Sequence, residues 1–185
     1  MKNQRFFTLI ELLVVIAIIS ILAGLVLAGV KGAITKAENT KAIADMTAIV
    51  NAVKQYEATY GRVPKHADWC DGNGKVTDLD AFYKMLQGEV KTTGNRRGIK
   101  LLSIKGTGPG KYIDPWDGDY TIYLDTDNDG KITQIPPGID ASTIYLSAVV
   151  FSEGPDGESG SDDTNDDNVY SFPVTREGNK FKLAN

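Results

Sequence analysis

The residues that most plainly suggest chemistry are three aspartates in the stretch DTDNDGKI, which begins at Asp125. An aspartate at every second position, with a glycine directly after the third, matches the first part of the calcium-binding loop of an EF-hand. The expected ligands are the carboxylates of Asp125, Asp127 and Asp129 and the backbone carbonyl of Lys131. They supply about four of the roughly six to eight oxygens that calcium requires. Pro136 stands where an EF-hand has its last acidic ligand, so other ligands must come from elsewhere or from water. The same residues favour a hairpin turn, and both interpretations can hold at once.

Two further segments are rich in acidic residues. The stretch from Glu153 to Asp167 contains seven acids and no lysine or arginine. Such like charges repel one another unless a cation neutralises them or the segment is solvated. The other segment, CDGNGKVTDLD, is a weaker candidate because Trp69 occupies its first ligand position. Its possible ligands are Asp71, Asn73 and Asp80.

The inventory of other reactive side chains is small. The chain has one cysteine, Cys70, and one histidine, His66, which excludes an intramolecular disulfide and leaves too few ligands for a zinc site. A Cys-His nucleophile pair would need these two residues to act together, and we expect instead a solvated loop. The acids lie in glycine-rich loops, which favours metal or solvent over a hydrolase with paired carboxylates. We therefore expect no enzyme, and the net charge of −4 argues against general nucleic-acid binding.

The N-terminal part of the chain is strongly apolar. From Phe7 to Val30 the only charged residue is Glu11. A helix over these residues would be about 36 Å long, which is enough to cross a hydrocarbon core of about 30 Å. The run is longer than the apolar core of a secretory signal peptide. Lys2 and Arg5 precede it, which places the N-terminus in the cytoplasm and the rest of the chain outside.

The helix is expected to continue beyond the apolar run. Apolar residues recur there at spacings of 4, 3, 4, 3 and 4: Ala42, Met46, Ile49, Val53, Tyr56 and Tyr60. These spacings define one face of an α-helix. Gly61 and Pro64 end the pattern, so the sequence predicts one helix from Phe7 to Tyr60.

The remaining residues predict an antiparallel sheet. A short helix is expected over Leu79–Gln87, where apolar residues recur three and four apart. Strands are expected at 120–125, 131–135, 143–151, 168–172 and 180–183, with a possible short strand at 101–104. The fold class is therefore α+β, with the sheet packed on the amphipathic half of the long helix.

The stretches FTLIELLVVIAIISILAGL and YGRVP closely resemble the N-terminal region of type IV pilins and type II secretion pseudopilins, which carry a class III signal peptide. The resemblance implies a pilin fold in four parts: a leader (1–6), an assembly half of the helix (7–30), an amphipathic half (31–61) and a head (62–185). It also implies that a prepilin peptidase cuts between Phe6 and Phe7 and that the new Phe7 amine is methylated. Glu11, with Thr8 nearby, would serve assembly, because Glu11 would pair with the Phe7 amine of a neighbouring subunit. The chain departs from the family at Phe6, where glycine is usual, and at Ala28, where many members have proline.

The second acidic segment also resembles a family feature, the C-terminal calcium loop of the major pseudopilin. The positions carried over are Asp156, Asp163, Asp166 and Asp167. The segment DPW, which starts at Asp114, resembles another part of that pseudopilin.

These features imply a structural subunit of a pilus-like extracellular filament with calcium-stabilised head loops. The alternative within the same class is the major pseudopilin of a type II secretion system. A membrane-anchored adhesin that never polymerises is a third possibility. The implied partners are other copies of the chain, a prepilin peptidase and an assembly platform in the bacterial inner membrane. The subunit would reside in that membrane before it enters a surface filament or a periplasmic pseudopilus.

Overall fold

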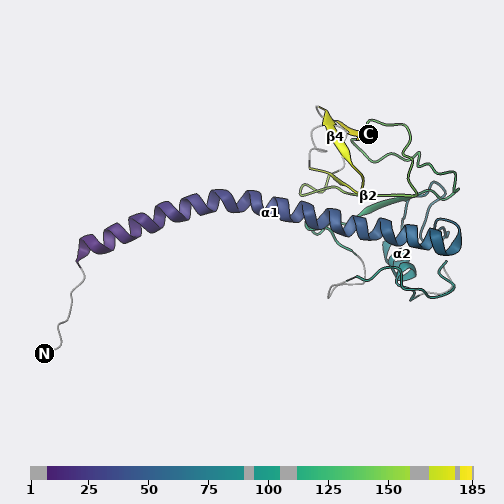
Figure 1. Cartoon of the computed structure of the whole chain (residues 1–185), viewed down its shortest axis with the longest axis horizontal. Helices are drawn as coiled ribbons and strands as arrows, with labels where there is room; N and C mark the ends of the chain where they lie inside the picture. Colours follow the sequence, from purple (N-terminus) through teal and green to yellow (C-terminus); the bar gives the residue numbers. More distant parts are fainter. Residues whose placement is uncertain (1–7, 90–93, 105–111, 159–166, 178–179, 185) are drawn as a thin grey trace. The chain divides into compact units, whose positions relative to one another are not determined.

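The computed structural model describes residues 8–89, 94–104, 112–158, 167–177 and 180–184. The chain forms two compact units, Met1–Glu38 and Asn39–Asn185. The helix α1, Leu9–Tyr60, runs through the first unit and into the second (Figure 1). This confirms the predicted long helix from Leu9 onward, whereas Phe7 lies outside the described residues.

The N-terminal part of α1 is apolar and exposed. Leu9 is 83% exposed and Leu25 is 70% exposed. By length and composition, α1 is the one helix in the described part of the chain that is suited to cross a membrane. The Ser20 hydroxyl donates to the Ile16 carbonyl at 2.7 Å, so this polar side chain is satisfied within the helix itself.

The C-terminal part of α1 is the helix on which the core of the head packs. Its predicted apolar face is buried, since Ala42, Met46, Ile49 and Val53 are fully covered and Tyr56 is 1% exposed. The helix ends where Gly61 adopts a left-handed conformation with φ of 71° and its N–H donates to the Glu57 carbonyl at 2.7 Å. Glycine adopts this conformation without steric cost, which explains why the helix stops there.

A small antiparallel sheet packs on this part of α1. Its order is β1 (Thr121–Leu124), β2 (Ala148–Ser152) and β3 (Val169–Tyr170). Ile122 pairs with Val150, and both side chains contribute to the core that contains the buried face of α1. All five residues of β2 are buried, because its other face contributes to a second apolar cluster that includes Phe151 and Tyr170.

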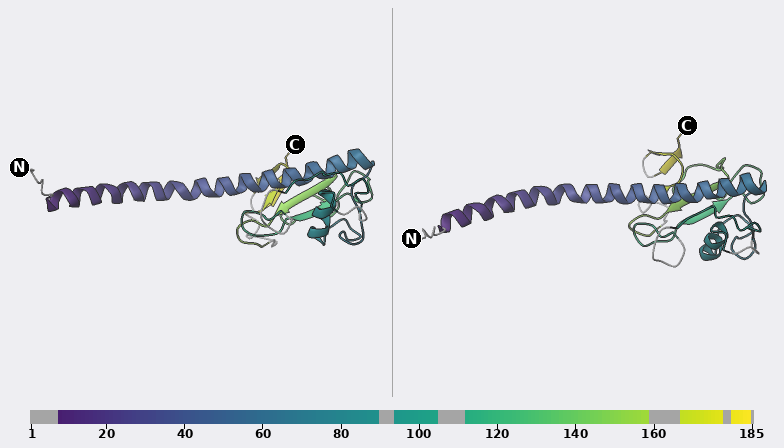
Figure 2. Two further views of the ribbon diagram at one scale, coloured as in Figure 1. Left: turned by 90° about the horizontal axis from the view of Figure 1, so that it is seen from below. Right: turned by 60° about the horizontal axis from the view of Figure 1, so that its bottom comes forward.

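The head also contains a short helix and a second, two-stranded sheet (Figures 1 and 2). The helix α2, Leu79–Leu86, is capped by the Asp78 carboxylate, which accepts from the Ala81 N–H at 3.0 Å. It buries Phe82, Tyr83, Met85 and Leu86 in the main core. The hairpin of β4 (Val174–Glu177) and β5 (Lys180–Leu183) contributes Phe181 to the second cluster.

Several details of the head differ from the sequence prediction. Residues 101–104 do not form a strand, because the N–H groups of Leu101 and Leu102 donate to the Leu86 carbonyl at the end of α2. The predicted strand at 131–135 is reduced to one bridge between Ile132 and Ile144, and the predicted strand at 143–151 begins only at Ala148. The strand β4 was not predicted.

The expectation of a solvated loop at Cys70 is also wrong. Cys70 is 7% exposed, belongs to the main core and forms a β-bridge with Val76. Burial raises the pKa of its thiol, which makes it a packing residue rather than a nucleophile.

Candidate functional site

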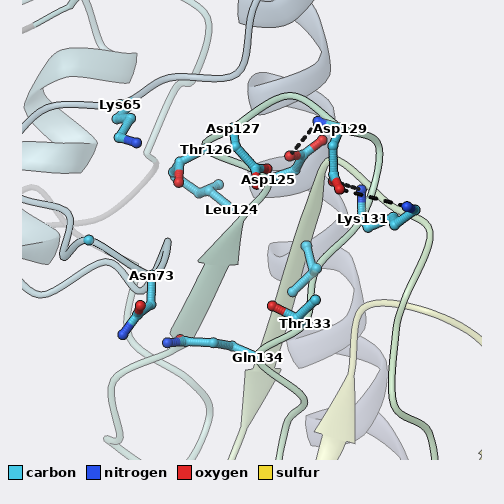
Figure 3. Close-up of a pocket in the computed structure, with 12 residues that line it drawn as sticks. Lys65, Asn73, Leu124, Asp125, Thr126, Asp127, Asp129, Lys131, Thr133 and Gln134 are labelled. Atoms are coloured by element: carbon cyan, nitrogen blue, oxygen red, sulfur yellow. Dashed lines mark hydrogen bonds and ion pairs between the residues drawn. The ribbon is translucent and has the colours of Figure 1, made fainter.

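The loop of residues 125–132, which we call the first acidic loop, brings its three aspartates together. Ligand oxygens of Asp125, Asp127 and Asp129 all lie within 4.8 Å of one another, and no other described group of three or more His, Cys, Asp or Glu residues does so. Figure 3 shows the three carboxylates at the end of β1, with Lys65 and Asn73 on the other side of a hollow of about 450 Å³. A set of carboxylates beside an open hollow with polar lining fits a hard cation such as calcium.

The backbone of this loop is organised around Asp125. One carboxylate oxygen accepts from the Asp129 N–H at 3.2 Å and the other from the Gly130 N–H at 2.8 Å. Asn128 and Gly130 both have positive φ, 59° and 80°, which folds the chain tightly. Asparagine and glycine are the residues that tolerate this conformation, so the stretch NDG specifies the turn locally.

The loop is also attached to the end of α1. The Asn128 side-chain oxygen accepts a hydrogen bond of 2.8 Å from the Val63 N–H, two residues beyond the Gly61 cap. From the sequence, Asn128 is expected only as a turn residue. No local pattern indicates a contact between residues that lie 65 positions apart.

The electrostatics of the loop favour a positive charge. Burial raises the pKa of Asp125, and a hydrogen bond with Asp127 raises it further, while backbone N–H groups of the loop oppose both effects. Two carboxylates this close favour either a shared proton or a cation. Lys131 already approaches the cluster, with its Nζ 3.8 Å from Asp129 Oδ2.

The second acidic segment is described in part. Asp163 and Asp166 lie outside the described residues. The Asp156 N–H donates to Asp167 Oδ2 at 3.3 Å, so the turn that begins at Gly154 lies beside Asp167. Gly154 has a φ of 74°, and a Cβ added there would meet the Asp167 carbonyl oxygen at 2.5 Å. These contacts bring two of the four expected ligand residues together.

Asp114 is connected to this turn through Ser152. Its buried carboxylate accepts from the Trp116 and Gly118 N–H groups at 3.0 and 2.6 Å and from the Ser152 hydroxyl at 2.5 Å. The Ser152 oxygen in turn accepts from the Gly154 N–H at 3.1 Å. The DPW segment is therefore a structural support for the second acidic segment, and Ser152 is a link that sequence analysis missed.

The third segment does not gather its predicted ligands in one cluster. Asp71 accepts from the Asn73 and Lys75 N–H groups at 2.9 and 2.8 Å, which makes it a turn residue. Asp80 lies in the first turn of α2 and pairs with Lys84 at 2.6 Å.

The start of α1 contains a reciprocal cap. Glu11 Oε2 accepts from the Thr8 N–H at 2.9 Å and from the Thr8 hydroxyl at 2.8 Å, and the Glu11 N–H donates to the same hydroxyl at 3.3 Å. This is the capping box that the spacing T-x-x-E specifies. The spacing of Thr8 and Glu11 carries this signal, although the role expected for Glu11 from the sequence was assembly alone. Phe6 and Phe7 lie outside the described residues.

A capped, apolar helix that continues into an amphipathic half, packed on a small antiparallel sheet, defines the pilin-like class. Residues 1–27 match the prokaryotic N-terminal methylation motif. The chain is 30% identical to type II secretion system core protein G of Escherichia coli strain K12, over 87% of this chain and 88% of that protein. The chain therefore belongs to the family of that core protein.

Other relatives support this membership. The core protein G of Aeromonas hydrophila is 30% identical over 88% of this chain and 90% of its own length. A fimbrial protein of Pseudomonas aeruginosa is also 30% identical, over 74% of this chain and 90% of its own length. The comparison with solved structures found no match.

Proposed function

We propose that this protein is a structural subunit of a type IV pilus-like filament, assembled through α1, and that it has no catalytic role. The observation that supports this most directly is the combination of the methylation motif at residues 1–27 with an exposed apolar helix joined to a compact head. An apolar helix of this kind requires either lipid or the helices of other subunits around it.

The proposed route to the filament begins in the membrane. Lys2 and Arg5 keep the N-terminus in the cytoplasm while the helix spans the bacterial inner membrane. A prepilin peptidase cuts between Phe6 and Phe7, the Phe7 amine is methylated, and an inner-membrane assembly platform moves the subunit into the filament. There Glu11 pairs with the amine of a neighbouring copy. The filament then lies at the cell surface.

Electron microscopy of sheared cell-surface material, with N-terminal sequencing of the subunit, tests this proposal. Long filaments whose subunit begins at methylated Phe7 are the expected result. A subunit that begins at Met1 would mean that Phe6 blocks the peptidase, and the processing step would be wrong. Processed protein that never leaves the membrane in any filament would contradict the function.

Calcium is proposed as a structural ligand of the head. Asp125, Asp127, Asp129 and the Lys131 carbonyl would hold one ion, and Asp156, Asp163, Asp166 and Asp167 would hold another. The clustering of the first three carboxylates supports the first site, and the contact between Asp156 and Asp167 supports the second. A cation at each site would neutralise like charges and tie distant segments of the head together.

Thermal unfolding of the full chain in detergent, in calcium and in chelator, tests the calcium proposal. A ligand at about one hundred times its dissociation constant stabilises the folded state by about 2.7 kcal/mol. We expect the double variant Asp127→Asn/Asp129→Asn to lose part of the calcium-dependent shift and to bind one ion fewer in a titration. Asp140→Asn, at an exposed aspartate outside both segments, is the matched control. Equal melting temperatures of the wild type in calcium and in chelator would contradict the proposal.

The major pseudopilin of a type II secretion system is the second candidate. The longer coverage of the core protein G relatives, 87–88% against 74% for the fimbrial protein, favours it. Two results together would support this candidate over a surface filament. Deletion of the protein would abolish protein export, and wild-type cells would carry no surface filaments.

A further inference from the structure

The basic and acidic residues of the head are concentrated in different segments of the chain. From Val90 to Ile113 there are six lysines and arginines and no acid, whereas Glu153 to Asp167 contains seven acids and no base. Two calcium charges would leave the acidic segment with a net charge of −5, so the asymmetry persists with an ion bound. Such separation along one chain gives the head a cationic and an anionic segment.

Asn95 anchors the described part of the basic segment through four hydrogen bonds. This fully buried side chain donates to the carbonyls of Met85 and Ile99 at 2.8 and 2.7 Å. Its oxygen accepts from the Tyr60 hydroxyl at 2.7 Å and from the Ile99 N–H at 3.1 Å. The loop is thereby fixed to the last turn of α1, where the Tyr56 hydroxyl also donates to the Gly94 carbonyl at 3.0 Å.

Three exposed arginines lie in these segments, Arg62 just after the Gly61 cap of α1 and Arg96 and Arg97 in the anchored loop, and we call them the arginine surface. The Arg97 guanidinium lies 5.7 Å from the centre of the Tyr60 ring, and the Arg97 N–H donates to the Tyr60 hydroxyl at 3.1 Å. Burial raises the pKa of Tyr56, and the positive charges of Arg62 and Arg96 oppose that rise. Within the described ranges, no ion pair joins these arginines to a carboxylate.

Exposed arginines on an anchored loop are suited to bind an anionic partner. Their planar guanidinium groups suit carboxylates, and the fixed loop reduces the entropy lost on binding. The chain itself offers carboxylates in the turn Glu153–Glu158. Glu158 is exposed there, and its N–H donates to Asp156 Oδ1 at 2.9 Å, which orders the turn.

We propose that the arginine surface of one subunit binds the turn Glu153–Glu158 of a neighbouring copy of this chain. The two surfaces differ, so the contact is heterologous, and a heterologous contact that does not close on itself propagates as an open filament. The proposal rests on the filament function and adds a contact between heads to it.

The test compares filament yield from cells that express full-length variants. We expect Arg96→Gln/Arg97→Gln to reduce the amount of sheared filament roughly tenfold, since about ten times weaker binding per contact corresponds to a loss of about 1.4 kcal/mol and this loss is repeated at every subunit of the filament. The control Lys75→Gln, at an exposed lysine in another loop, should assemble as the wild type does. Melting of each full-length variant in detergent verifies that it folds. If the wild type forms filaments and the double variant forms them equally well, the proposed contact is wrong while the filament function stands. If the wild type forms none, the filament function itself fails.

A charge exchange identifies the partner. Arg97→Glu and Glu158→Lys should each reduce assembly, and the two together should restore it. In addition, a short bis-maleimide should produce a ladder of covalent multimers from filaments that carry Arg97→Cys/Glu158→Cys, since the native Cys70 is buried. Filaments with Lys75→Cys/Glu158→Cys should give no ladder. Failure of both rescue and crosslinking would overturn the proposal.

Discussion

The Asn128 side chain accepts a hydrogen bond of 2.8 Å from the Val63 N–H and so joins the first acidic loop to the turn that ends α1. Val63 is 1% exposed, which leaves its N–H little access to solvent. The first acidic loop and the C-terminal end of α1 are therefore joined directly within the head.

Removal of this hydrogen bond is expected to destabilise the head. Asn128→Gly keeps the φ of 59° free of strain but leaves the Val63 N–H without its acceptor, which costs about 1–3 kcal/mol. Asn128→Ala should cost about 1–2 kcal/mol more, because alanine is strained in a left-handed conformation. Urea unfolding of the full chain in detergent measures both, and Asn73→Ala at an exposed position is the control. A glycine variant as stable as the wild type would contradict the role of this hydrogen bond.

The backbone at Gly74 lies close to the backbone at Leu124, which leads to a second prediction. Gly74 has a φ of 95°, and its carbonyl accepts from the Leu124 N–H at 2.9 Å. A Cβ at Gly74 would collide with the Leu124 carbonyl oxygen. We expect Gly74→Ala to cost about 1–3 kcal/mol from the collision, in addition to the strain of its φ. Gly72→Ala, two residues away in open space, should stay within about 0.5 kcal/mol of the wild type in the same urea measurement. Equal effects of the two substitutions would contradict this reading.

The sequence predicted the parts of the fold that depend on local patterns. The spacing of Ala42, Met46 and Ile49 specified the buried face of α1 because a helix repeats every 3.6 residues. The stretch DTDNDG specified a turn that gathers three carboxylates, because asparagine and glycine tolerate positive φ there. In both cases the information lies within a few residues of the structure that it determines.

The parts that were missed depend on distant partners. The bond from Val63 to Asn128 and the four bonds of Asn95 join segments whose proximity no short window reveals. The stretch LLSI has strand-like composition, yet its N–H groups bond to the end of α2 instead of a neighbouring strand. The short strand β4 forms through its pairing with β5, and this pairing is not visible in the local sequence of β4.

The half-buried Asp45 on α1 leads to a prediction about pH. Burial raises its pKa above the ordinary value of 3.8, although the positive charge of Lys41 opposes the shift. The folded state thus binds a proton more tightly than the unfolded state, so stability from this group is present at low pH and is lost as the pH rises through the raised pKa. Asp45→Asn should remove this loss, and the variant should gain stability relative to the wild type as the pH rises from about 4 through the raised pKa. Urea unfolding across this range measures the difference, and Asp140→Asn should follow the wild type. A constant difference at all pH values would contradict the assignment.

The two roles available to Glu11 can be separated by one substitution. In the isolated chain its carboxylate caps α1 through Thr8, and glutamine can replace glutamate at this position of a capping box. The proposed pairing with the Phe7 amine of a neighbouring subunit requires the negative charge, and breaking a buried ion pair costs about 3–5 kcal/mol. We therefore expect Glu11→Gln to keep the start of the helix, as measured by hydrogen exchange, and to lose filament assembly as fully as Glu11→Ala does. Both variants should remain in the membrane at wild-type levels, which separates failed assembly from failed insertion. If Glu11→Gln assembles normally while Glu11→Ala does not, the acid serves only as a helix cap, because the charge that distinguishes it from glutamine would have no effect on assembly.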